Sequence, residues 1–184
     1  MAIQLERLAA APSEPVSLAE VKAALRLTYD SEDAVLAGLI TAAREGVEAE
    51  LGVSLAPTRW REVRDGFAPA DGEGALGLLR GPLISVETIT AADPSGAAQT
   101  LDPRRYRVLA GRPGRVAPVA QAWPHPGVSG GGVVIDYTAG FDPAPEPLRQ
   151  AVVARAAWRF LNREAAPPPD LAEGLLAPFR LPRL

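Results

Sequence analysis

Cysteine is absent from this 184-residue sequence, which excludes disulfides, a thiolate nucleophile and metal sites with cysteine ligands. Histidine occurs once, at His125, so a zinc centre or a Ser-His-Asp triad would depend on that one imidazole. No apolar run reaches the roughly 20 residues that a membrane span needs, and the N-terminus has no signal-peptide pattern. We therefore expect a soluble protein made in a cytoplasm, with no membrane partner.

Lysine is almost absent as well, since Lys22 is the only one and nearly all positive charge is arginine. The formal net charge of −3 argues against a protein that coats nucleic acid through its overall charge. Arginines nonetheless gather in two places, at Arg59, Arg61 and Arg64 and at Arg104, Arg105, Arg107, Arg112 and Arg115. They could contact a phosphate backbone or an acidic partner, or they could be a solvated strand edge whose charge prevents aggregation, and the second explanation is favoured.

Two helices are expected in the first fifty residues. Ser17 and Glu20 have the spacing of a capping box, which predicts a helix over about 17–28. A longer amphipathic helix is expected over 31–51, capped by Asp30 or Ser31 and ended by Gly52. Its apolar stripe comprises Val35, Leu36, Leu39, Ile40, Ala43, Val47 and Leu51, and its solvated side comprises Thr41, Arg44, Glu45 and Glu48.

Small residues recur every four positions on one flank of the long helix, at Gly38, Ala42 and Gly46. Each glycine inside a helix costs roughly 0.5–1 kcal/mol relative to alanine, so a close neighbour is expected to offset that cost. The neighbour could be another helix of the same chain, which is favoured, or another subunit. Scattered small residues in a sequence rich in alanine and glycine are the simpler alternative.

The segment between about 58 and 138 has the pattern of short strands separated by glycine and proline. A third helix is expected over 147–163, with Leu148, Ala151, Val152, Ala156 and Phe160 on its buried side. The predicted fold class is α+β, with an N-terminal helical hairpin and a C-terminal helix packed with a small antiparallel β unit. Residues 1–166 are assigned to this domain.

Residues 167–184 are expected to form a polyproline spacer followed by an extended apolar tail. The tail carries Leu171, Leu175, Leu176, Phe179, Leu181 and Leu184, together with Arg180 and Arg183. So many apolar side chains are unusual for a disordered segment, so the tail either folds back on its own domain or docks on another protein.

No catalytic, cofactor-binding or metal site is predicted. His125 lies in the sequence Trp-Pro-His-Pro-Gly, which is typical of an exposed loop. The three glycines at 130–132 are followed by neither a helix nor a lysine, so they do not form a phosphate-binding loop. A small arginine-using nucleic-acid-binding module is one alternative, and a hydrolase or lyase that uses His125 as its base is the less favoured one.

Several stretches together resemble the head–tail connector (adaptor) proteins of tailed phages and phage-like gene transfer agents. They are PVSLAEVKAALRL, SEDAVLAGLITAAREGVEAELG, the TRW strand, RGPL with SVETI, YTAGF and PLRQAVVARAAWRFLNRE. The resemblance covers roughly residues 15–164 and depends on the order and spacing of these motifs.

This resemblance implies a structural protein rather than an enzyme. Such adaptors form a closed ring of about twelve subunits under the portal, at the head–tail junction of the particle. The ring extends the DNA channel without sequence-specific binding and links the portal to the stopper, or head-completion, protein. The resemblance further implies that the C-terminal segment reaches the portal. The eight tail residues from Leu171 to Leu184 named above would then be its docking contacts.

Overall fold

Two units make up the chain, and the polypeptide passes between them after residues 11, 56 and 140. The first unit holds Met1–Ala11 and Pro57–Gly140, and the second holds Pro12–Ala56 and Phe141–Leu184. The predicted boundary near residue 166 falls outside the described residues and stays a prediction. The computed structural model describes residues 3–9, 13–67, 74–119, 122–124, 126–127, 131–163 and 171–181.

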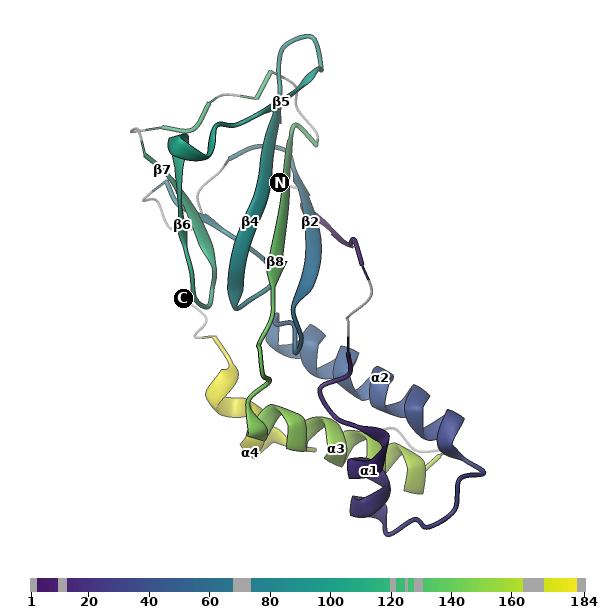
Figure 1. The fold of residues 1–184 in the computed structure, drawn as a ribbon. Coiled ribbons are helices and arrows are strands. Elements are labelled where there is room, and N and C mark those ends of the chain that lie inside the picture. Colours follow the sequence, from purple (N-terminus) through teal and green to yellow (C-terminus); the bar gives the residue numbers. More distant parts are fainter. Residues whose placement is uncertain are drawn as a thin grey trace. The chain divides into compact units, whose positions relative to one another are not determined.

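The first unit contains two antiparallel sheets (Figure 1). The larger has the strand order β1-β2-β8-β4-β5, and the smaller has the order β3-β7-β6. Its elements are β1 (Ile3–Arg7), β2 (Thr58–Arg64), β3 (Leu76–Gly77), β4 (Leu83–Ala92), β5 (Ala98–Thr100), the 3-10 helix η1 (Pro103–Arg105), β6 (Tyr106–Leu109), β7 (Arg115–Pro118) and β8 (Val133–Ala139).

Strand β8 is the centre of the larger sheet, because it pairs with both β2 and β4. Its alternate residues Val133, Ile135, Tyr137 and Ala139 are completely buried, as expected for a strand with one face on a core. Side chains from both sheets form one buried cluster. The short strands expected between 58 and 138 are confirmed, whereas β1 lies outside that segment and was not predicted.

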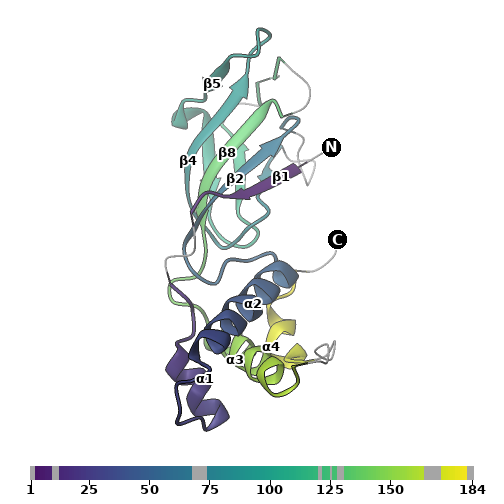
Figure 2. The same cartoon turned by 90° about the vertical axis from the view of Figure 1, so that its right-hand side faces the viewer.

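The second unit is helical (Figure 2). Its elements are α1 (Leu18–Leu25), α2 (Asp33–Leu51), α3 (Glu146–Leu161), α4 (Glu173–Leu176) and the 3-10 helix η2 (Ala177–Phe179). All five residues expected on the apolar side of the third helix are buried in α3. In the part of the chain that the structure describes, no helix is both long and apolar enough to cross a bilayer.

Of the caps predicted for the first two helices, only the first is present in the structure. Ser17 forms the predicted capping box with Glu20, since each residue's side chain accepts a hydrogen bond from the other's backbone N–H. The cap predicted for the second helix is wrong: α2 begins after Glu32, without a side-chain cap. Gly52 ends α2 in the left-handed conformation as expected, with φ of 65°.

The predicted faces of α2 need two corrections. Val35 was placed in the apolar stripe, but it is 52% exposed. Arg44 and Glu48 were placed on the solvated side, but both are buried and form an i,i+4 ion pair with Nη1–Oε2 at 2.8 Å. Both are tolerated inside because Arg44 also binds Glu14 at 2.8 Å, while Glu48 Oε1 accepts a hydrogen bond from the Leu55 N–H at 2.8 Å.

Replacing Glu48 with alanine is expected to destabilise the chain by about 3 kcal/mol, because Arg44 loses its buried partner and the Leu55 N–H loses its acceptor. Glu45→Ala is the matched control, because Glu45 lies on the same helix but is 55% exposed, and it should cost less than about 0.5 kcal/mol. Urea unfolding measures both, and equal losses in the two variants would contradict this account of Glu48.

Candidate functional site

The described residues offer interaction surfaces rather than a catalytic centre. The hydrolase candidate His125 lies outside the described residues. Among those described, no group of three or more histidine, cysteine, aspartate or glutamate side chains is placed to hold a metal ion. The candidate interaction surfaces are the C-terminal tail, the small-residue flank of α2 and the exposed arginines. Polar contacts at the start of α1 connect two helices of the same unit.

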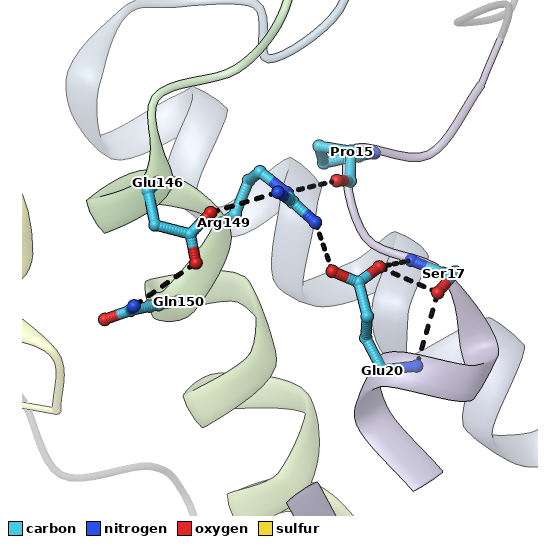
Figure 3. Close-up of polar contacts among 6 residues, drawn as sticks. All are labelled: Pro15, Ser17, Glu20, Glu146, Arg149 and Gln150. Atoms are coloured by element: carbon cyan, nitrogen blue, oxygen red, sulfur yellow. Dashed lines mark hydrogen bonds and ion pairs between the residues drawn. The ribbon is translucent and has the colours of Figure 1, made fainter. Parts of the chain in front are cut away.

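Polar contacts join the start of α1 to α3 (Figure 3). Arg149, on the first turns of α3, donates from Nε to the carbonyl oxygen of Pro15 at 3.0 Å and also forms an ion pair with Glu20. Its Nη1 lies 3.0 Å from Glu146. An arginine near the start of a helix opposes the helix dipole, and this was the one sequence signal that Arg149 needed a partner.

Two hydrogen bonds from Ser17 lower the pKa of Glu20. The larger effect comes from the backbone N–H and the smaller from the hydroxyl. The nearby guanidinium of Arg149 acts in the same direction. Glu20 is therefore ionised in the folded chain and serves two helices at once, as the second half of the cap of α1 and as the anion for Arg149.

The predicted docking tail packs on its own helical unit over residues 171–181. Leu176 of α4 is completely buried there, and Leu175 and Phe179 pack against the same cluster. The rings of Phe179 and Phe141 meet edge to face, with centroids 6.5 Å apart. This part of the tail is therefore folded back rather than extended, which is the first of the two alternatives that the sequence left open.

Polar contacts at the end of α2 add to this packing. Glu50 receives Arg180 of the tail at 2.6 Å and Arg155 of α3 at 2.5 Å. Arg180 also pairs with Glu173 at 2.6 Å. Leu181 remains 43% exposed and Leu171 is half-buried, while Arg183 and Leu184 lie outside the described residues.

The small-residue flank of α2 is largely open, so the close neighbour expected within the chain or in another subunit stays a prediction. Gly38 and Gly46 are exposed and Ala42 is half-buried. A methyl group at Gly38 would meet no atom within 4 Å, and one at Gly46 would meet only the guanidinium of Arg155, at 3.8 Å. Within that distance, Arg155 of α3 is the one described neighbour of the two glycines.

The arginines divide into engaged and exposed groups. Arg64 is buried and bonds to Glu62, and Arg61 forms a bidentate pair with Asp136 at 2.7 and 2.8 Å. Arg104, Arg105 and Arg107 are exposed. Of the two sequence interpretations, a contact surface is therefore possible at η1 and β6 but not at Arg64.

Comparison with family models gives one match, to part of the chain. Residues 15–93 match the model of the phage gp6-like head-tail connector protein family. No curated protein matches the chain in sequence.

Three solved chains share the fold over nearly the whole length. One, from the neck of an empty GTA particle computed with C6 symmetry, is 24% identical with a TM-score of 0.84 and covers 98% of this chain and 97% of that one. A chain of the virion of a native gene transfer agent (GTA) particle is 25% identical with a TM-score of 0.82, and the match covers 98% of this chain and 96% of that one. The third, from the neck of a native GTA particle computed with C12 symmetry, is 25% identical with a TM-score of 0.77, and the match covers 98% of this chain and 97% of that one. The predicted α+β fold is confirmed.

Ser17→Ala is expected to cost roughly 0.5–2 kcal/mol at pH 7 and to raise the pKa of Glu20 toward its ordinary value. The folded-state pKa is depressed, so this contribution is complete above the unfolded-state pKa and is lost as the pH falls through the folded one. The cost of the substitution should therefore shrink in acid. NMR titration and urea unfolding at pH 7 and pH 3 test this, with the exposed Ser13→Ala as control; a cost independent of pH would contradict it.

Proposed function

From the match of residues 15–93 to the model of the phage gp6-like head-tail connector family, which confirms the predicted resemblance, we propose that this chain forms a ring in the neck of a phage-like particle. The family is structural, and the chain is an adaptor rather than an enzyme. In the proposal about twelve copies assemble under the portal, at the head–tail junction. The ring extends the DNA channel and offers a platform to the stopper protein.

The observation that carries this proposal is the extent of the structural match. The neck chain of the native GTA particle is covered over 97% of its length, so the likeness includes both units of this chain. That particle neck was computed with C12 symmetry, which supports a cyclic assembly of about twelve copies here. Its partners are proposed to be the portal, the stopper and neighbouring copies.

The charge of the chain suits a DNA channel. Twelve copies at −3 each would give a ring of about −36, which repels a passing duplex rather than binding it. A nucleic-acid-binding module is a weaker candidate, because Arg61 and Arg64 are already engaged by carboxylates of the same unit. We infer passage of DNA without sequence-specific recognition.

A closed ring needs a heterologous interface, in which one face of a subunit meets a different face of the next. The flank formed by Gly38, Ala42 and Gly46 is a candidate for one of these faces, because a helix with so little side-chain volume allows close approach. A neighbouring subunit would supply the packing that the chain itself does not.

The tail remains the proposed contact with the portal, with one change to its mechanism. Because Leu176 is buried in the helical unit, the folded-back tail presents Leu181 and the outer side of Arg180 rather than all its leucines. Contact through Leu175, Leu176 and Phe179 would require release of the tail from α2 and α3. The first portal contact is therefore expected near Leu181.

Leu181→Asp is expected to leave folding intact and to reduce attachment to portal-bearing heads by about tenfold or more, since Leu181 is 43% exposed and its loss opens no cavity. Leu161→Asp is the matched control, an equally apolar residue at the end of α3 that is 70% exposed. Co-sedimentation with tailless heads measures attachment, and thermal unfolding checks the fold. Attachment of L181D at the level of the unsubstituted chain would refute the tail assignment.

A further inference from the structure

A second surface lies in the β unit, away from any role proposed above. It is a cleft of about 170 Å³ next to η1 and the end of β7. Most of its surface is apolar, and two arginines are among its lining residues. It is lined by Leu101, Arg104, Arg105, Pro118, Val119, Ala122, Trp123 and Pro124.

The apolar side of the cleft is held in place by Trp123. Its ring stacks on Phe67 with centroids 4.7 Å apart and planes 5° from parallel. Its indole N–H donates to the carbonyl oxygen of Gly74 at 2.7 Å. Leu101 is buried beside it, whereas Val119 is 57% exposed. A fixed aromatic ring beside an exposed valine is typical of a preformed pocket for one apolar side chain.

The chain segment that supplies most of the cleft lining, residues 101–119, has a charge opposite to that of the whole chain. Residues 101–119 carry five arginines and one acid, while the complete chain has a formal charge of −3. That acid, Asp102, accepts a hydrogen bond from the Arg104 N–H as the cap of η1. Arg104 and Arg105 are exposed, and the described part of the chain supplies no ion pair to either. The edge of the cleft is thus a site for carboxylates.

We propose that this cleft binds an acidic peptide segment of another protein, which inserts one apolar side chain between Val119 and Trp123 and places carboxylates on Arg104 and Arg105. The volume suits a side chain the size of leucine. Charge complementarity supplies the orientation and the apolar pocket supplies the specificity. A nucleic acid would contact the arginines but would leave the apolar surfaces of Pro118 and Val119 uncovered.

This surface goes beyond the connector assignment, because it needs neither a ring nor a portal. It is therefore tested on the isolated chain, where failure says nothing about the neck proposal.

The probe is the capped pentapeptide Glu-Glu-Leu-Glu-Glu, and the readouts are tryptophan fluorescence and NMR shifts at low salt. Binding is expected to weaken about tenfold when glycine replaces the leucine, and again about tenfold in Arg104→Ser/Arg105→Ser. The matched control is Arg59→Ser, an exposed arginine of β2, which should bind as the unsubstituted chain does. Trp123→Phe identifies the fluorescence that belongs to the cleft, since the chain has three tryptophans.

Three results would overturn the proposal. One is the absence of binding at millimolar peptide in low salt. Another is equal affinity for the leucine and glycine peptides, which would make the surface merely basic. The third is displacement of the peptide by a 20-base-pair duplex at lower concentration, which would make it a nucleic-acid site. The double serine variant should unfold at the same temperature as the unsubstituted chain, so that a loss of peptide binding can be attributed to the cleft.

Discussion

Each unit is organised around one buried glutamate that ties an irregular segment to a regular element. In the helical unit, Glu48 pairs with Arg44 and accepts the N–H of Leu55, just after α2 ends. In the β unit, Glu62 of β2 accepts the N–H of Leu79 at 2.6 Å and the hydroxyl of Tyr137 at 2.5 Å. Burial is the main cause that raises the pKa of Tyr137, and the charge of Glu62 raises it further. The phenol therefore stays protonated and can donate its hydrogen bond. A buried carboxylate is stable only when such partners are in place, so each glutamate fixes a unique local arrangement.

Features that depend on local spacing could be predicted from the sequence. The capping box at Ser17, the buried stripe of α3 and the short strands between 58 and 138 follow from neighbours within a few residues. The buried charges could not be predicted, because pattern reading assigns every charge to solvent, and the partners that compensate Arg44 lie up to 30 residues away. The same limit hid Arg149, whose contact with Glu20 spans 129 residues.

The residues of the candidate surfaces could be identified from the sequence, but whether they are buried or exposed could not. The leucines of the tail were identified as anchors, yet only the structure shows that Leu176 is already buried in its own unit. The flank of Gly38 and Gly46 was recognised, but only the structure shows that both glycines are exposed. The exposed parts of the tail and of the α2 flank are the surfaces that we propose for assembly.

The central claim is that this chain is a ring component between portal and stopper. A cryo-electron microscopy map of the particle neck tests it most directly. The account predicts a closed ring of about twelve copies under the portal, with Leu181 near the portal and the Gly38–Gly46 flank against a neighbouring copy. A map in which this chain is absent from the head–tail junction, or is present there without cyclic contacts between copies, would contradict the account.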